Sequence, residues 1–220
     1  MHLFYLHGFA SSAKSTKAMW LAAHLRPLGL PLHSPDFNEP EFETITTSRM
    51  IRQVHDAIAR LPKGPVVLIG SSLGAFVAWH TAARQSLEMA ARSPITRLVL
   101  LAPALDFGTN RKMGTVEIKQ WRDDGHLDIF HHAFGEHRRV GYELYADAEQ
   151  YDSFSVGDGP PTVIFQGRLD DAVDPVMVER FARSRSHVEC RLLDDGHQLH
   201  DSLDTIWAQI TDFLGLKCSG

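Results

Sequence analysis

The stretch that decides the fold of this 220-residue chain is Val66-Val67-Leu68-Ile69-Gly70-Ser71-Ser72-Leu73-Gly74-Ala75-Phe76. Its first four residues are apolar and predict a buried strand, and the residues from Leu73 onward predict the opening of a helix. Between them, residues 70–74 have the pattern Gly-x-Ser-x-Gly. Between a strand and a helix, this pattern is typical of a nucleophile elbow, a sharp turn that exposes its serine above a sheet.

The two glycines of the pattern fit the geometry that such a turn requires. Ser72 would adopt a backbone conformation that side chains disfavour, and Gly70 and Gly74 would come too close to it for side chains of their own. The helix would point its free N–H groups at an oxyanion formed on Ser72. A phosphate-binding loop would need a Gly-Lys-Ser/Thr ending, which is absent.

Composition places the chain among ordinary soluble globular proteins, with 44% apolar and 22% charged residues. Its length suits one domain over residues 1–220. The net charge of −5 argues against nucleic acid or an anionic membrane as a partner. No stretch approaches the ~20 apolar residues that would insert into a membrane, and no signal peptide is expected. Cys190 and Cys218 form no disulfide framework, which fits a cytoplasmic location.

Apolar strand-like runs alternate with helical periodicity along most of the chain. Strands are predicted at residues 3–6, 31–35, 66–69, 98–101, 162–165 and 188–193, and helices at 18–28, 51–61, 73–91 and 199–213. This alternation predicts an α/β fold in which a mainly parallel sheet of about six strands carries helices on both faces.

Partners for Ser72 follow later strands of this sheet. A serine hydroxyl is a poor nucleophile, so it needs a base to take its proton and an acid to hold that base. Behind a Gly-x-Ser-x-Gly elbow, the acid and then the base follow along the chain. Asp170 and Asp171 come after the fifth predicted strand, and His197 after the sixth. His197 is preferred to His200, which is expected at the beginning of the last helix.

Three aspartates compete for the role of the acid: Asp170, Asp171 and Asp174. Asp174 precedes Pro175 at a predicted helix start, and we interpret it as a structural N-cap. The residues alone leave Asp170 and Asp171 as alternatives.

The turn His7-Gly8-Phe9 follows the first predicted strand. A glycine there lets the backbone approach a bound substrate, so we assign Gly8 to substrate binding. We assign the two oxyanion-hole donors to the backbone N–H groups of Phe9 and Leu73. A simple strand-ending turn is the alternative.

The chain as a whole resembles the α/β-hydrolase superfamily. Residues 5–12, Tyr-Leu-His-Gly-Phe-Ala-Ser-Ser, and residues 14–18, Lys-Ser-Thr-Lys-Ala, resemble small bacterial carboxylesterases of the YqiA type. The resemblance implies that the strands lie in the spatial order second, first, third, fourth, fifth, sixth. It favours Asp170 over Asp171, because Gly-x-x-Asp-x-x-Val recurs at this loop in related hydrolases. The longer middle segment and the absence of two strands before the His-Gly turn are departures, so substrate preference is not carried over.

Residues 105–156 break the alternation, lack a clear strand, and are rich in charge, histidine and aromatic residues. We predict a helical, lid-like insertion over the site; an extra helical pair on the sheet edge is the alternative. Trp121, Phe130 or Phe134 would then contact the substrate, although they equally suit packing of the lid onto the body. The histidines lack metal-ligand spacing, so we interpret them as part of a solvated face and expect no metal.

The sequence therefore predicts a serine hydrolase that cleaves carboxylic esters through an acyl-enzyme. Ser72 is the nucleophile, His197 the base, and Asp170 the residue that orients it. The expected partner is a small-molecule acyl ester or thioester, with no cofactor, and no oligomeric state is predicted. An acyl thioesterase and a catalytically silent hydrolase-fold binding protein are the alternatives.

Overall fold

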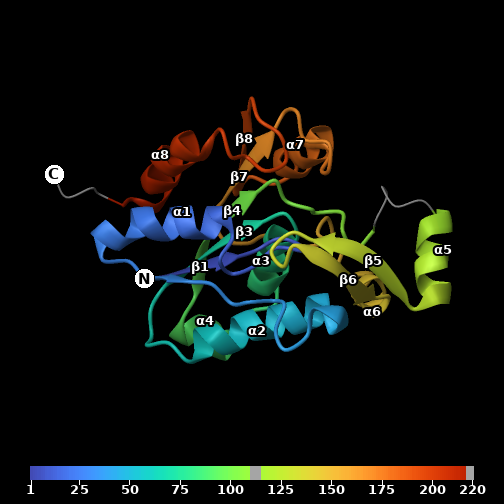
Figure 1. Ribbon diagram of the computed structural model, residues 1–220. Helices are drawn as coiled ribbons and strands as arrows, with labels where there is room; N and C mark the ends of the chain where they lie inside the picture. The colour runs from blue at the N-terminus through green and yellow to red at the C-terminus, as the bar shows by residue number, and fades with distance from the viewer. Residues whose placement is uncertain (110–114, 217–220) are drawn as a thin grey trace.

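A six-stranded sheet forms the centre of the computed structural model, which describes residues 1–109 and 115–216 (Figure 1). Cys218 lies outside these residues. The strands are β1 (His2–Leu6), β2 (Leu32–His33), β3 (Val66–Ser71), β4 (Ile95–Leu101), β7 (Thr162–Gly167) and β8 (Val188–Leu193). Their order is β2-β1-β3-β4-β7-β8, and all neighbours are parallel. The predicted strand order is confirmed.

Helices cover both faces of the sheet, as predicted (Figure 1). On one face lie α1 (Thr16–Leu25) and α8 (Leu203–Leu214), and on the other α2 (Thr47–Ala59), α3 (Leu73–Ala83) and α7 (Pro175–Arg183). Alternate side chains of each strand point to opposite faces, so that Leu3 and Tyr5 pack under α1 and α8 while Phe4 and Leu6 join the other core. No helix in the described part of the chain is long and apolar enough to cross a membrane.

Two predicted helices differ from those observed. The single helix expected over residues 73–91 ends at Ala83, and α4 (Leu87–Arg92) begins separately, because the Ser86 side chain caps it by accepting from the N–H of Met89. The last helix begins at Leu203 rather than at 199. Leu199 has a φ of +54° and belongs to the preceding loop. Short 3₁₀ turns cover Arg26–Leu28 (η1) and Phe42–Thr44 (η2).

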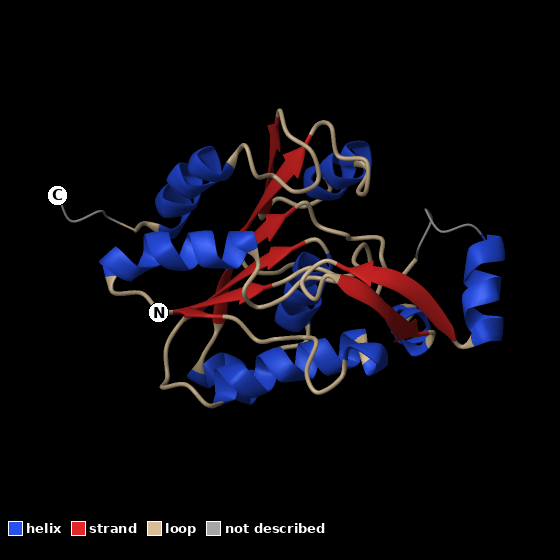
Figure 2. Ribbon diagram, in the orientation of Figure 1, coloured by secondary structure: helices blue, strands red, loops and turns tan. Residues whose placement is uncertain are grey.

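The insertion is not purely helical, so that part of the prediction is wrong. It contains α5 (Thr115–Asp124), the antiparallel pair β5 (His126–His131) and β6 (Glu136–Gly141), and α6 (Glu143–Ala148) (Figure 2). Asp128 and Arg139 lie opposite each other in this hairpin and form an ion pair of 3.4 Å. In the sequence, Leu127 and Ile129 alternate with other residues as in a strand, but the charged residues among them made this pattern difficult to recognise.

A buried histidine on α3 is held in its neutral form. His80 is fully buried; its Nδ1 accepts from Nη1 of Arg84 at 2.9 Å, so Nε2 carries the proton and donates to Oγ of Ser153 at 3.1 Å. Burial, followed by the neighbouring charge of Arg84, lowers the pKa of His80 to about 3.

This histidine predicts a loss of stability in mild acid. Below the ordinary histidine pKa of ~6.5, His80 is protonated in the unfolded chain but remains neutral in the folded protein. The free energy of unfolding therefore decreases as the pH drops from ~6.5 toward 3. Between pH ~7 and ~5 this amounts to roughly 2 kcal/mol. Urea unfolding at both pH values should show His80→Gln losing about that much less than the wild type. Equal losses in the two proteins would contradict the assignment.

Candidate active site

Ser72 sits on a strained turn between β3 and α3, with φ 53° and ψ −116°. Its N–H donates to the carbonyl oxygen of Leu101 at 2.9 Å, which ties the turn to the end of β4. Its own carbonyl accepts from the N–H groups of Ala75 and Phe76 at 3.0 and 3.2 Å, which opens the helix. The backbone is therefore fixed on both sides, and the hydroxyl lies above the carboxyl edge of the sheet.

The two glycines of the elbow stand at backbone-to-backbone contacts. A Cβ on Gly74 would overlap the carbonyl oxygens of Leu6 and His7, and one on Gly70 would overlap the backbone of Gly74 and Ala75. Glycine is thus required for α3 to approach the end of β1 this closely. This contact places the loop after β1 next to the elbow.

A continuous hydrogen-bond chain joins three of the predicted residues. His197 Nε2 lies 3.1 Å from Ser72 Oγ, and His197 Nδ1 lies 2.9 and 3.1 Å from the two carboxylate oxygens of Asp170. A carboxylate only accepts, so the imidazole proton resides on Nδ1, and Nε2 accepts from the Ser72 hydroxyl. Asp174 instead caps α7 by accepting from the N–H of Val176, as predicted.

The Asp170 side chain is fully buried, and donors surround its carboxylate. Besides His197, the N–H groups of Ala172 and Val173 donate to Oδ1 at 2.9 and 2.8 Å, and Nε2 of Gln166 donates to Oδ2 at 2.8 Å. Burial alone raises the pKa of Asp170, but the bonds from His197, Val173 and Gln166 outweigh it and hold the pKa below its usual value. Asp170 therefore stays ionised at neutral pH.

The loops that carry Asp170 and His197 are locked against each other. A Cβ on Gly167 would overlap the carbonyl oxygens of Asp195 and Gly196, so the two loops meet through their backbones. Asp195 accepts from the N–H of Gly196 at 2.7 Å and from that of Ser202 at 3.0 Å, which closes the histidine loop on itself.

The loop after β1 lies beside the nucleophile. A Cβ on Gly8 would stand 3.4 Å from Ser72 Cβ, so this glycine touches the elbow. Within residues 1–109 and 115–216, the backbone N–H groups of Phe9 and Leu73 donate to no backbone or side-chain acceptor. Both predicted oxyanion donors are thus free to bind a ligand.

Buried polar side chains fix this loop and connect it to the insertion. His7 Nε2 accepts from the N–H of Phe37 at 2.9 Å. Asn38 donates through Nδ2 to the carbonyl oxygen of Ser11 at 2.9 Å, and its Oδ1 lies 3.1 Å from Nε2 of buried His131. Asn38 therefore bridges the loop after β1 and the β5–β6 hairpin.

A cavity of about 750 Å³ opens above Ser72 and His197. The turn of the hairpin contributes His132 and Ala133 to its wall, and the N–H of Ala133 approaches the carbonyl oxygen of Ala10 at 3.4 Å. The insertion thus reaches the carboxyl edge of the sheet beside the nucleophile. Other lining residues include Tyr5, Gly8, Phe9, Ser12, Lys14 and Lys17.

The aromatic residues expected to contact the substrate do not line this cavity. Trp121 is 4% exposed, packs within the insertion, and donates through Nε1 to the carbonyl oxygen of Val140 at 3.1 Å. Phe130 and Phe134 are 45% and 44% exposed on the hairpin. The prediction for Trp121 is therefore corrected: the residue packs the insertion together.

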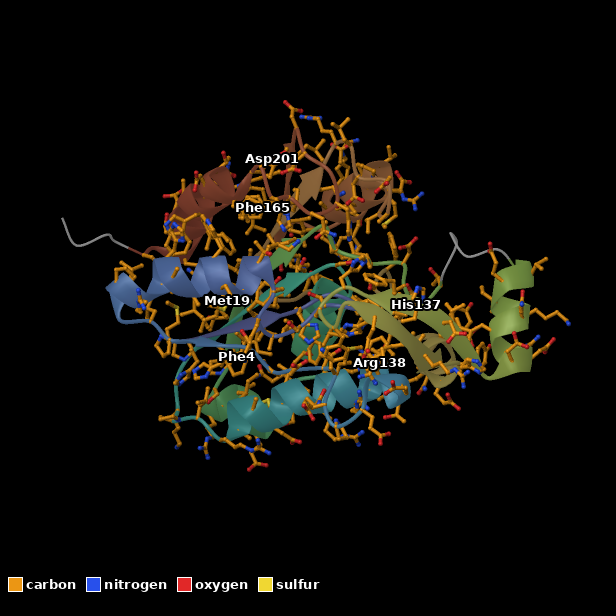
Figure 3. The ribbon with its side chains drawn as sticks, in the orientation of Figure 1. Phe4, Met19, His137, Arg138, Phe165 and Asp201 are labelled. Carbon is orange, nitrogen blue, oxygen red and sulfur yellow. The ribbon has the colours of Figure 1, made fainter. Side chains whose placement is uncertain are left out.

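Arg138 (Figure 3) pairs with Glu43 at 3.1 Å and holds the hairpin against η2.

Sequence reasoning missed three residues of the site. Lys17 is 7% exposed and donates through Nζ to the carbonyl oxygen and side-chain Oε1 of Gln198, at 2.8 and 3.3 Å. Its position at helical spacing from the apolar residues of α1, on the face that packs against the sheet, could have indicated that this lysine is buried. Gln166, a polar residue at the end of the apolar run of β7, was another usable signal. Asn38 carries no such signal, because its role depends on tertiary contacts.

The described residues of the histidine-rich insertion form no metal-binding cluster. Over residues 1–109 and 115–216, no three His, Cys, Asp or Glu side chains gather in an arrangement that could hold a metal ion.

Comparison with known families places the chain by sequence. The model described as "Uncharacterised protein family (UPF0227)" matches residues 2–215. The chain belongs to this family. Comparison with curated protein sequences finds no match.

Solved structures show which fold this UPF0227 member has. It is similar to Est1E from Butyrivibrio proteoclasticus with ferulic acid bound (17% identity, TM-score 0.78, 97% of this chain and 88% of that one). It is also similar to alpha/beta hydrolase domain-containing protein 10 from mouse (18%, 0.77, 97% and 89%). A monoacylglycerol lipase from Paleococcus ferrophilus matches at 14% identity and a TM-score of 0.74, over 96% and 93% of the chains. The chain has the α/β-hydrolase fold.

The backbone contact at Gly74 predicts a severe defect on substitution. Gly74→Ala should lower the free energy of unfolding by about 3 kcal/mol, because the new methyl group overlaps the end of β1. Gly64→Ala is the matched control, since its Cβ meets only the His2 side chain, at 3.4 Å, and should change stability by less than about 0.5 kcal/mol. Urea unfolding followed by circular dichroism measures both. A Gly74→Ala protein as stable as the wild type would show that the contact is not tight.

Proposed function

We propose that the protein is a serine hydrolase that cleaves carboxylic esters through an acyl-enzyme. The observation that carries the proposal is the hydrogen-bond chain from Ser72 through His197 to ionised Asp170, beside free backbone donors and a cavity. The fold shared with a protein named as a monoacylglycerol lipase supports ester substrates.

In the first step, the Ser72 hydroxyl attacks the carbonyl carbon of the ester while His197 Nε2 takes its proton. His197 then returns the proton to the leaving alcohol, and an acyl group remains on Ser72. Water, activated by the same nitrogen, attacks this acyl-enzyme and releases the acid. Asp170 keeps the imidazole in the required tautomer and stabilises the imidazolium that forms in each step.

The negative charge of each tetrahedral intermediate develops on the former carbonyl oxygen. The N–H groups of Phe9 and Leu73 are the proposed donors to it, and both are held before the substrate arrives. Leu73 lies in the first turn of α3, so the positive end of the helix dipole adds to this stabilisation.

Ser72→Ala should reduce ester turnover by several orders of magnitude without unfolding the protein. Ser71→Ala, which alters the buried neighbour in the same turn, is the control and should retain most activity. A chromogenic butanoate ester measures turnover, and a fluorophosphonate probe should label the wild type and Ser71→Ala but not Ser72→Ala. If the wild type remains unlabelled, the protein is a silent binder.

Asp170→Asn should lower turnover by about 10⁴-fold, because an amide at this position permits the wrong imidazole tautomer. Asp174→Asn should spare turnover, since asparagine also caps a helix. Steady-state kinetics on the same ester, with melting temperatures as a folding check, compare the two. An Asp170→Asn enzyme within tenfold of the wild type would remove Asp170 from the mechanism. A separate comparison of a butanoyl oxygen ester with a butanoyl thioester would show whether the enzyme prefers an alcohol or a thiol as the leaving group.

A further inference from the structure

The charged residues that line the cavity above Ser72 are basic, although the protein as a whole carries a net negative charge. Acidic residues outnumber Lys and Arg by 27 to 22 in the chain, yet none of the described residues that line the cavity is Asp or Glu. The lining instead includes Lys14, Lys17, His132 and His200, together with the hydroxyl groups of Ser12 and Thr16. This is the chemistry that binds phosphate and carboxylate groups.

Lys17 is a buried cation whose bonding capacity is not filled. An ammonium has three N–H donors, and within the described residues only the two oxygens of Gln198 accept from Nζ. Burial lowers the pKa of Lys17 to about 8, although Asp195 and Asp170 act in the opposite direction. The side chain is thus still charged at neutral pH, and a bound anion would offset the desolvation of this cation.

Lys14 supplies a second, more accessible charge at the start of α1. It is exposed, lines the same cavity, and forms no ion pair with a described residue. The first turn of the ten-residue helix α1 lies here as well, and its dipole adds positive potential at the same wall.

We propose that this wall is an anion subsite, in which Lys14 and Lys17, with the hydroxyl groups of Ser12 and Thr16, bind a phosphate or carboxylate group carried by the substrate. The inference rests on the proposed function and narrows it to esters with a negatively charged group. The aromatic residues Trp121, Phe130 and Phe134 of the insertion are not among the residues that line the cavity.

Matched esters test the subsite and locate the anion. Butanoyl esters of 2-hydroxyethyl phosphate and of 3-hydroxypropanoate are compared with that of ethylene glycol, and monomethyl with dimethyl adipate, by titrating the acid released. The first set places the charge on the alcohol, as phosphate or carboxylate, and the second places it on the acid. At least one charged ester should exceed its neutral counterpart in kcat/KM by about tenfold. Raising NaCl from about 0.02 to about 0.5 M should reduce that ratio, because Lys14 is exposed.

Variants of Lys14 test whether this residue causes the preference for charged esters. Lys14→Met should lower the charged-to-neutral ratio by about threefold to fivefold, the effect of losing one partly exposed ion pair, while Lys14→Arg should keep the ratio. Lys63→Met removes the same charge from an exposed loop at the opposite edge of the sheet and should leave the ratio unchanged.

Failure of the subsite is distinguishable from failure of the proposed function. Charged and neutral esters hydrolysed at equal kcat/KM, with turnover still dependent on Ser72, would overturn the subsite alone. If no ester is hydrolysed, calorimetric titration of Ser72→Ala with the phosphate ester and the glycol ester decides the subsite independently. Tighter binding of the phosphate ester that is lost in Ser72→Ala/Lys14→Met supports it, and equal binding overturns it.

Discussion

The structure depends on one backbone contact, between Gly74 at the start of α3 and the carbonyl oxygens of Leu6 and His7 at the end of β1. Only a residue without Cβ permits this approach. It brings the loop after β1, which contains Phe9, beside the elbow, which contains Leu73, although the two segments are far apart in sequence. Because the contact is made by main chain, neither loop can relax without separating a strand from a helix. The strain at Ser72 is thereby maintained.

The opposite side of the site is built by the same principle. Gly167 lets the end of β7 meet the backbone of the His197 loop, and Asp195 closes that loop through its own hydrogen bonds. Asp170 can then be buried and ionised at once, since it accepts from backbone, amide and imidazole donors together. A buried carboxylate without these donors would take up a proton. The negative charge that Asp170 places beside the His197 imidazole therefore depends on how the two loops pack.

Sequence predicted the parts of the molecule that local physics determines. The elbow and the capping role of Asp174 follow from residues close together in the chain, whereas the order of the sheet came from the resemblance to α/β-hydrolases. The hairpin in the insertion was missed because its alternation is short and interrupted by charge. The place of Trp121 could not be predicted, since an aromatic residue suits a substrate pocket and a core equally well. Asn38 joins Ser11, 27 residues before it, to His131, 93 residues after it, a role that only the folded chain creates.

The way the insertion is attached determines what kind of cavity the site can have. Its turn meets the loop after β1 through the Asn38–His131 link and the contact of Ala133 with Ala10, while its aromatic residues pack inward or lie on its outer surface. A wall made in this way presents polar backbone and imidazole to the cavity. The start of α1 also lines the cavity and presents ammonium and hydroxyl groups. Against these polar groups, an apolar chain would desolvate donors without satisfying them, whereas an anion would satisfy several at once. The proposed selectivity for charge therefore rests on the same contacts that hold the insertion in place.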